Sequence, residues 1–269
     1  MDEPIRVAVS GAAGRMGRTS VRAISREQDM VLVGALGRSQ GLGRDAGELA
    51  GVGSLGVIIT GDLDRMLREA APHVLVDFAP GPAAVVNARK AILQGVRPVI
   101  GGTGMSEAEI EELSALAREQ GVGAVVAPNF ALGAVLMMTF ARQAARFFPH
   151  VEIIELHHDR KRDAPSGTAI KTARLIGQER GNIPKPPGRE EEVVAGARGG
   201  DVEGIRIHSV RLPGLIAHQE VIFGSPGQTL TIRHDSYSEE SFMPGLLLAI
   251  RKVMSLNHLV VGMEQLLGL

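Results

Sequence analysis

The segment from Glu155 to Ala169 reads E-L-H-H-D-R-K-R-D-A-P-S-G-T-A, and it gathers acid–base and cationic groups directly before a predicted helix. Pro165 and Ser166 are typical of helix starts, so the N–H groups of Gly167 and Thr168 are expected to be donors without helical partners. Such donors and cations suit a substrate with more than one carboxylate. A histidine beside them can supply a proton near neutral pH.

The run H-H-D-R-K-R by itself is more typical of a solvated surface loop with ordinary charge than of a ligand site. The D-A-P-S-G-T that follows it favours a ligand site, because it adds a helix start to the cations. We therefore predict that this segment binds a small dicarboxylate and that Ser166 is one of the substrate-binding residues.

A second candidate site is the glycine-rich turn in V-A-V-S-G-A-A-G-R-M-G, between a predicted strand and a predicted helix. Its G-x-x-G-x-x-G spacing is a variant of G-x-G-x-x-G, which lets the pyrophosphate of a dinucleotide approach backbone N–H groups at a helix start. Such a turn can also simply join strand to helix, but the strand–helix alternation after it favours cofactor binding. The predicted cofactor residues of this turn are Gly11, Ala12, Ala13, Gly14, Arg15 and Met16.

Two further segments follow predicted strands and are expected at the same rim of the sheet. Ligands bind where the carboxyl ends of such strands meet, so these loops are candidates for the nicotinamide half of the cofactor. As isolated tetrapeptides they are equally compatible with ordinary loops. The first segment contains Gly101, Gly102 and Thr103 and ends with Gly104. The second contains Ala127, Pro128, Asn129 and Phe130.

The end of the second predicted strand, in M-V-L-V-G-A-L-G-R-S, bears on the choice of nicotinamide. An acidic residue at this place would accept hydrogen bonds from the ribose of NADH, whereas an arginine can pair with the 2′-phosphate of NADPH. The chain has Gly37 and Arg38 there. We predict that NADPH is preferred and that NADH is also accepted.

The order of predicted elements defines the fold class. Short apolar runs at 5–10, 30–36, 57–60, 74–79, 98–102 and 124–129 alternate with helical patterns at 16–26, 62–70, 83–93 and 106–120. This alternation predicts an α/β fold with a Rossmann-type doubly wound parallel sheet.

A second, α+β domain is predicted after a helix at 131–148. It contains a strand at 151–158, a helix at 166–179, a mobile loop at 181–204 and strands at 205–212, 218–223 and 229–235, with S-P-G-Q as a hairpin connection. The last helix, 241–254, is placed back on the first domain. The expected domains are thus 1–130 completed by 241–269, for the dinucleotide, and 131–240, for the substrate and for oligomerisation.

Composition limits the possible partners. The net charge of −1 argues against nucleic acid and anionic membranes, and the longest apolar run, 131–141, is too short for a membrane span. The chain has no cysteine, so disulfides and thiolate metal sites are excluded, and its N-terminus lacks the pattern of a signal peptide. A cytoplasmic protein is expected.

Taken together, these motifs resemble the dihydrodipicolinate reductases, also called 4-hydroxy-tetrahydrodipicolinate reductases, of the lysine and diaminopimelate pathway. The resemblance covers nearly the whole chain, through V-S-G-A-A-G-R-M-G, V-I-G-G-T-G, A-P-N-F-A-L-G, E-L-H-H-D-R-K-R-D-A-P-S-G-T-A and T-I-R-H-D-S-Y-S-E-E-S-F-M-P-G. It implies reduction of an unsaturated cyclic imine dicarboxylate by a nicotinamide, without a metal, in a homotetramer formed through an open mixed sheet.

The resemblance also implies roles for single residues. His157 matches the proton donor or acceptor, His158 a substrate ligand, Lys161 the second catalytic cation, and Gly167 with Thr168 the carboxylate cradle. Two positions depart from the family pattern. Gly102 stands where a threonine is usual, and Glu239 stands where an arginine is usual, which puts one substrate contact in doubt.

Two other functions stay open at this point. Another two-domain amino- or keto-acid dehydrogenase would share the nucleotide domain but would not explain H-H-x-x-K-x-D-A-P-S-G-T. A nucleotide-bound redox sensor could keep the fold and lose the chemistry. His157 and Lys161 argue against the sensor, and Glu239 keeps it open.

Overall fold

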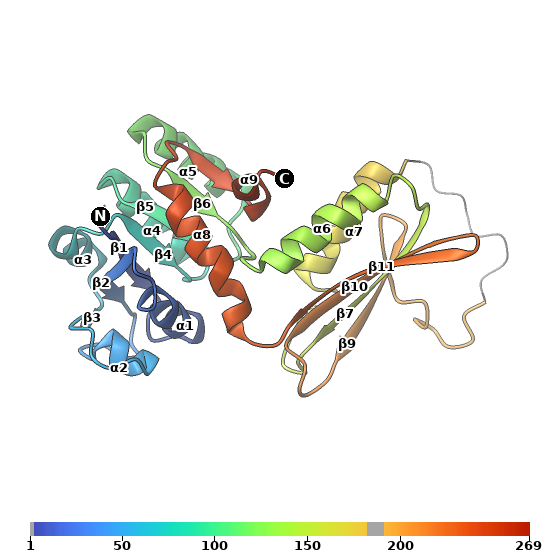
Figure 1. The fold of residues 1–269 in the computed structure, drawn as a ribbon, viewed down its shortest axis with the longest axis horizontal. Helices are drawn as coiled ribbons and strands as arrows, with labels where there is room; N and C mark the ends of the chain where they lie inside the picture. Colours follow the sequence, from blue (N-terminus) through green and yellow to red (C-terminus); the bar gives the residue numbers. More distant parts are fainter. Residues whose placement is uncertain (1–2, 182–190) are drawn as a thin grey trace. The chain divides into compact units, whose positions relative to one another are not determined.

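A computed structural model describes residues 3–181 and 191–269. The chain forms two compact units, unit 1 from Met1–Ala131 with Phe242–Leu269 and unit 2 from Leu132–Ser241. Each unit has its own sheet, and the two are described separately below (Figure 1).

The sheet of unit 1 is entirely parallel and has the order β12-β6-β5-β4-β1-β2-β3. Strands β2 and β3 lie on one side of β1, and β4, β5 and β6 lie on the other side. The strand order therefore reverses between β1 and β4. The doubly wound parallel sheet that the sequence predicts is confirmed. Its strands are β1 (Ile5–Ser10), β2 (Met30–Leu36), β3 (Ile59–Thr60), β4 (Val74–Asp77), β5 (Arg97–Ile100), β6 (Ala124–Val126) and β12 (Leu259–Val261).

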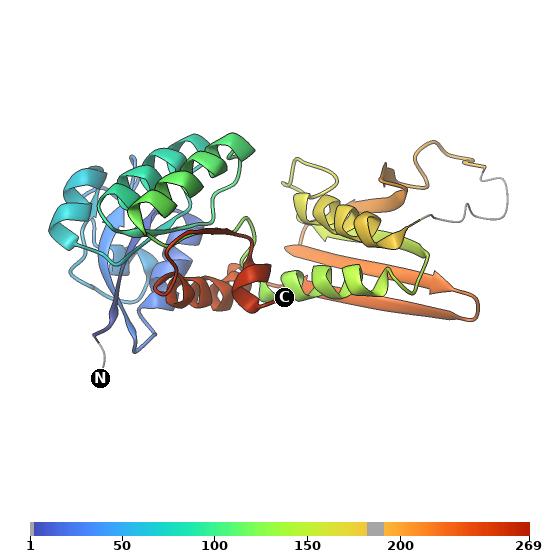
Figure 2. The ribbon, with the colours of Figure 1, turned by 90° about the horizontal axis from the view of Figure 1, so that it is seen from above.

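Helices cover both faces of this sheet (Figure 2). Clusters of fully buried aliphatic side chains lie between the strands and α3, α4 and α5 on one face. On the other face α1 packs against α8, where the Ser20 hydroxyl lies 3.8 Å from the sulfur of Met243. The helices of unit 1 are α1 (Arg15–Ile24), α2 (Ala46–Ala50), α3 (Leu63–Ala70), α4 (Gly81–Leu93), α5 (Glu107–Gln120), α8 (Met243–Val253) and α9 (Met263–Leu267).

The C-terminal segment is held on unit 1 by charge as well as by packing. Near the end of α8, the Arg251 guanidinium donates to both carboxylate oxygens of Asp29, at 2.7 and 2.8 Å, and also pairs with Glu27. These acidic groups raise the pKa of Arg251 above its ordinary value. Residues more than 220 positions apart in the chain are thereby joined beside the start of β2.

Unit 2 contains a mixed sheet of order β11-β10-β7-β9-β8, in which β7 and β9 are parallel and the other pairs are antiparallel. Helices α6 (Leu132–Ala144) and α7 (Gly167–Arg180) pack on each other and on its strands. The strands are β7 (His150–His157), β8 (Gly200–Val202), β9 (Ile205–Arg211), β10 (Ala217–Ser225) and β11 (Gln228–Ser236). The predicted hairpin is present, with Gly227 at φ +80° in its turn.

Three predictions about elements need correction, and three short elements were missed. The helix predicted at 131–148 ends at Ala144, because the next residues form turns before β7. The loop predicted at 181–204 contains β8, which pairs with β9, while its residues 182–190 lie outside the described residues. The last long helix begins at Met243, after a 3₁₀ turn at Glu239–Phe242. The short elements α2, β12 and α9 were not predicted.

Candidate active site

The glycine-rich turn connects β1 to α1 in the manner its sequence predicts. Gly11 has φ +77°, which favours glycine, and its carbonyl accepts from Gly14 N at 2.9 Å. A Cβ on Gly17 would lie only 2.1 Å from Gly11 O, so Gly17 lets α1 pack against the turn. Gly14 occupies the N-cap of α1 and supplies no side-chain cap, and the first turn of the helix has no acidic residue. The start of α1 is therefore suited to an anion such as a pyrophosphate.

Three of the loops at the carboxyl ends of the strands meet around Phe78. A Cβ on Gly101, after β5, would lie 2.8 Å from the Phe78 ring and 2.8 Å from the Phe130 ring. The Cβ of Phe78 also lies 3.9 Å from the position that a Cβ on Gly11 would take. The loops after β1, β4, β5 and β6 thus share one rim, at the place where the strand order reverses. This is where ligands bind in open parallel sheets.

A buried carboxylate supports the segment after β4. Asp77 is fully buried, accepts from Ala79 N at 2.8 Å and from the Asn87 side chain at 2.9 Å, and lies beside Ser10 of β1. Gly102 packs against the same segment, since a Cβ there would lie 2.1 Å from Ala79 O. In this backbone arrangement a larger side chain at position 102 would clash with the Ala79 carbonyl, so glycine fits here.

Arg38 follows β2 and is exposed. Within residues 3–181 and 191–269, no carboxylate forms an ion pair with its guanidinium. Gly37 before it is buried, and a Cβ there would lie 2.9 Å from the Ile59 side chain, so that no acidic side chain could stand at position 37 without displacing its neighbours.

In unit 2, the predicted helix start at Pro165 and Ser166 is confirmed. Ser166 is the N-cap of α7, where its side chain accepts from Ala169 N at 3.2 Å, and the peptide bond before Pro165 is cis. A Cβ on Gly167 would meet no atom within 4 Å, and Gly167 does not have a positive φ. The fold therefore places no demand for glycine at this position, whereas the close approach of a ligand to the helix start would.

His157 ends β7 and is held by a buried carboxylate. Its Nδ1 lies 2.5 Å from Glu155 Oε2, and Glu155 has no exposed surface. The Arg211 guanidinium donates to both oxygens of Glu155, at 2.9 and 2.7 Å, and Ser166 N donates to it at 3.2 Å. Burial would raise the pKa of Glu155, but hydrogen bonds from His157, Arg211 and Ser209 outweigh it and lower this pKa to about 2.

Lys161 lies on the loop between β7 and α7, where its Nζ donates to both oxygens of Asp163 at 2.8 Å. The hydrogen bond from Lys161 is the main reason why the pKa of Asp163 is below its ordinary value. The backbone carbonyl of Asp163 accepts from Arg211 at 2.7 Å. A chain of hydrogen bonds therefore links Lys161, through Asp163 and Arg211, to Glu155 and His157.

The structure says less about the roles of His158, Ser166 and Glu239. His158 Nδ1 is buried and has no hydrogen-bond partner among the described residues. Ser166 N–H and Oγ already take part in hydrogen bonds within the protein. Glu239 lies in the 3₁₀ turn before α8 and has an interaction partner, so it is not an unpaired charge. The roles of these three residues stay predictions.

Sequence reasoning missed three residues that shape these sites, namely Phe78, Glu155 and Arg211. Glu155 lies two residues before His157, and residues at this spacing share one face of a strand, so its proximity could have been found. Arg211 could not, because its proximity to Glu155 depends on the pairing of β7 with β9.

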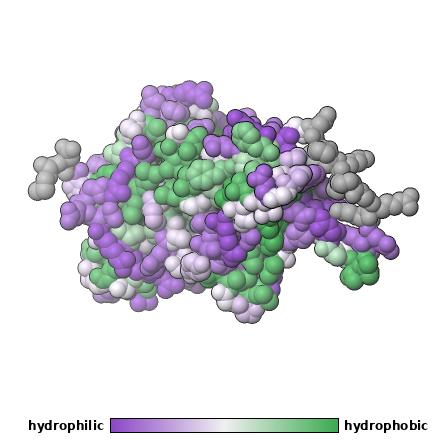
Figure 3. All heavy atoms as spheres, turned by 45° about the vertical axis from the view of Figure 1, so that its right-hand side comes forward, coloured by the Kyte–Doolittle hydropathy of each residue, from purple (hydrophilic) through white to green (hydrophobic). Residues whose placement is uncertain are grey.

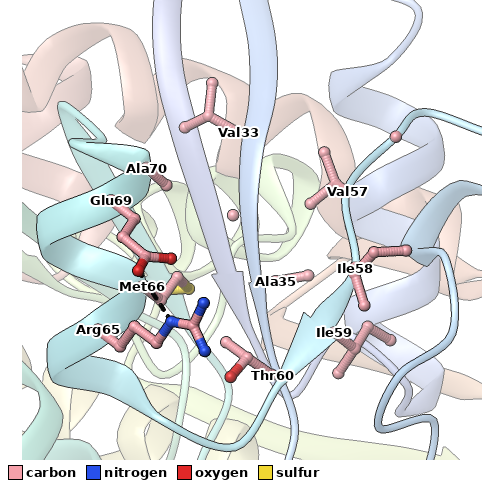
Figure 4. A pocket seen from close by; sticks show the side chains of 12 residues that line it. Val33, Ala35, Val57, Ile58, Ile59, Thr60, Arg65, Met66, Glu69 and Ala70 are labelled. Atoms are coloured by element: carbon pink, nitrogen blue, oxygen red, sulfur yellow. Dashed lines mark hydrogen bonds and ion pairs between the residues drawn. The ribbon is translucent and has the colours of Figure 1, made fainter.

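A cavity of about 450 Å³ lies elsewhere in unit 1, between β2, the segment before β3 and α3 (Figure 4). Its lining is largely aliphatic, with the Arg65–Glu69 ion pair on α3 at its side. It contains none of the predicted cofactor residues, so we assign it no part in the chemistry.

In the described part of the chain, no helix is long and apolar enough to cross a membrane, and no group of three His, Asp or Glu side chains could hold a metal.

The chain has a glycine-rich turn at the reversal point of a parallel sheet, and its second unit carries an imidazole, a lysine and a helix start capped by Ser166. These features are those of a nicotinamide-dependent oxidoreductase of two-domain type. Sequence comparison is more specific. Residues 5–130 match the family description "Dihydrodipicolinate reductase, N-terminus", and residues 133–267 match "Dihydrodipicolinate reductase, C-terminus". The chain belongs to the dihydrodipicolinate reductase family.

Individual relatives agree with this assignment. The chain is 57% identical over 263 residues to a 4-hydroxy-tetrahydrodipicolinate reductase of Moorella thermoacetica, covering 98% of each chain. It is 50% identical over 273 residues to that of Synechococcus elongatus, covering 99% of this chain and 100% of the relative. A dipicolinate-bound dihydrodipicolinate reductase from Paenisporosarcina sp. TG-14 has a TM-score of 0.87 and 42% identity, over 97% of this chain and 99% of that one.

Proposed function

We propose that the protein reduces the unsaturated cyclic imine dicarboxylate derived from 4-hydroxy-tetrahydrodipicolinate to tetrahydrodipicolinate, in lysine and diaminopimelate biosynthesis. The observation that carries this proposal is the Lys161 and His157 network beside the free start of α7, in a chain that also has the glycine-rich turn. The relatives named above support the choice of substrate. Oxidation of NADPH or NADH by the purified protein with freshly generated substrate tests it.

Each residue has one task in this proposal. The start of α1 and the loops around Phe78 hold the dinucleotide, which supplies a hydride when bound. The N–H groups of Gly167 and Thr168 and the Lys161 ammonium hold a substrate carboxylate. Lys161 also stabilises negative charge that develops on the substrate as the hydride arrives. His157 donates the proton from Nε2, because its Nδ1 is bonded to Glu155.

A first prediction concerns Gly167. Gly167→Ala leaves the fold intact, because the added methyl group meets no protein atom within 4 Å. It places that methyl group where we propose that the substrate carboxylate approaches, so the substrate KM should rise by about 10-fold or more, with a smaller change in kcat. Gly224→Ala is the matched control, since a Cβ there also meets no atom within 4 Å, and Gly224 lies at the end of β10 that pairs with His150 rather than at the end that pairs with His157. An unchanged KM in Gly167→Ala would place the carboxylate elsewhere.

A second prediction concerns the cofactor. We propose that NADPH is preferred over NADH, because Arg38 is exposed and can pair with a 2′-phosphate. Arg38→Ala should lower kcat/KM for NADPH by about 10- to 100-fold, as for the loss of a charge-assisted hydrogen bond, and leave NADH little changed. Arg118→Ala, at the end of α5, is a control for the loss of one surface arginine. A wild-type preference for NADH, or an NADPH preference untouched by Arg38→Ala, would contradict this assignment.

We also propose that the protein is a homotetramer assembled through unit 2. Hydrophobic residues interrupt the hydrophilic surface (Figure 3). In unit 2, the large side chains of Phe140, Phe147, Leu230 and Tyr237 are exposed in the single chain. Association of copies through this unit would bury such side chains. Light scattering at micromolar concentration tests the proposal, and a mass of one chain would refute it.

A further inference from the structure

We propose that Glu155 is a positioning residue for catalysis, which fixes the protonation site of His157 and directs Nε2 of its ring to the substrate. This inference rests on the function proposed above, because it concerns the proton that His157 supplies. Glu155 touches neither substrate nor cofactor in this account. It acts through His157, the loop of Lys161 and the start of α7.

Glu155 has more partners than its charge requires. A buried carboxylate is costly unless it is paired and hydrogen-bonded. Arg211 already provides one positive charge and two donors in a bidentate arrangement, at 2.9 and 2.7 Å. The contact with His157 Nδ1, at 2.5 Å, is therefore not needed to neutralise Glu155. This contact instead determines which nitrogen of the His157 imidazole carries a hydrogen.

The charge of Glu155 fixes the tautomer of the His157 ring. With a pKa of about 2, Glu155 is ionised throughout the pH range in which an enzyme of this kind works. An ionised carboxylate can only accept hydrogen bonds, so His157 Nδ1 must carry a hydrogen. The proton that leaves the imidazolium then comes from Nε2, and the neutral ring that remains keeps its Nδ1–H bond to Glu155. No rotation of the ring is needed between turnovers.

The same carboxylate also joins the other parts of the site. Ser166 N, at the cap of α7, donates to Glu155 Oε1 at 3.2 Å. Arg211, which is bound to Glu155, also donates to the backbone carbonyl of Asp163 at 2.7 Å, and the side chain of Asp163 holds Lys161. Glu155 and Arg211 thus set the positions of the proton donor, the cation and the helix start relative to one another.

Unit 2 provides a matched control. Glu152, three residues earlier on β7, also accepts from an arginine, Arg198, and from an imidazole, His208 Nε2, at 2.8 Å. Because side chains alternate along a strand, Glu152 projects from the face opposite to Glu155. Glu152→Gln therefore removes a carboxylate with the same kinds of partner from the same strand without touching the His157 network.

The experiment combines kinetics with ¹⁵N NMR of histidine-labelled protein, with the His157 signals assigned from their loss in His157→Gln. Glu155→Gln keeps the shape and the acceptor oxygen but removes the charge, and its amide can instead donate to Nδ1. We expect kcat to fall by about 10²-fold with the substrate KM within a few-fold of wild type. Glu152→Gln should keep wild-type kcat. The neutral His157 ring should be protonated at Nδ1 in wild type and gain Nε2–H tautomer in Glu155→Gln.

Three outcomes would overturn the inference. These are wild-type kcat in Glu155→Gln, an equal loss of kcat in Glu152→Gln, and a neutral His157 ring protonated at Nε2 in wild type. The tautomer of His157 is measured in the wild-type protein, so this measurement can overturn the inference even if Glu155→Gln does not fold. A wild-type protein without reductase activity would instead refute the proposed function, and the tautomer would still be measurable.

Discussion

His157→Gln should lower kcat for substrate reduction by about 10²- to 10⁴-fold while leaving the fold and nicotinamide binding unchanged. Glutamine has no group that can be protonated and deprotonated near neutral pH, so the proton would have to come from water. Its amide can still donate to Glu155, which Arg211 continues to neutralise. The buried carboxylate is therefore not left without a partner, and a loss of activity reports on proton transfer. Stopped-flow and steady-state measurements of NADPH oxidation check the prediction.

His208→Gln is the control for this change, because it removes another imidazole that is bonded to a carboxylate, Glu152, on the same sheet. It should keep wild-type kcat. If His157→Gln retains kcat within a few-fold of wild type, then another group supplies the proton, and the role of Glu155 proposed above fails with it.

Lys161→Met should reduce kcat by about 10²-fold or more, because it removes a cation that stabilises charge only as the hydride arrives. The folded state should tolerate the change. Among the described residues, Lys161 forms its ion pair with Asp163. The Lys161 side chain is 20% exposed and that of Asp163 is 61% exposed, and ion pairs that solvent reaches contribute little to stability. The expected signature is thus a large kinetic loss with a thermal midpoint close to that of wild type.

Lys90→Met is the matched control for Lys161→Met. Lys90 Nζ pairs with Asp64 at 2.6 Å in a partly exposed ion pair of unit 1, between α4 and α3, in which the lysine is more exposed than Lys161. It should lose neither activity nor stability to a measurable extent. Equal losses of activity in the two variants would show that Lys161 acts through structure rather than through transition-state charge.

Most of unit 1 could be predicted from the sequence, because buried parallel strands are continuous apolar runs and the amphipathic helices between them have a clear period. The short elements could not. The five-residue helix α2 is held by tertiary contacts, since Asp45 accepts from Gly47 N and Leu55 N and caps the helix. Strand β8, with three residues, exists only through its pairing with β9.

The site was predictable where chemistry is local in the sequence. The glycine-rich turn and the cap at Ser166 are defined by neighbouring residues, and the structure has both in the predicted form. Arg211 and Phe78 are different, because their roles arise from the register of β7 with β9 and from the convergence of loops around Gly101. Such contacts join segments that the sequence alone does not bring together.

The most direct test of the central proposal is a steady-state assay of the purified wild-type protein with freshly generated substrate, in which the nicotinamide absorbance is followed with NADPH and with NADH. The proposal predicts turnover that requires both the cyclic dicarboxylate and a reduced nicotinamide, that falls by about 10²-fold or more in Lys161→Met and that yields tetrahydrodipicolinate. Binding of NADPH without any substrate-dependent oxidation of either cofactor would contradict it, and would instead indicate a nucleotide-binding protein of the same fold without the reaction.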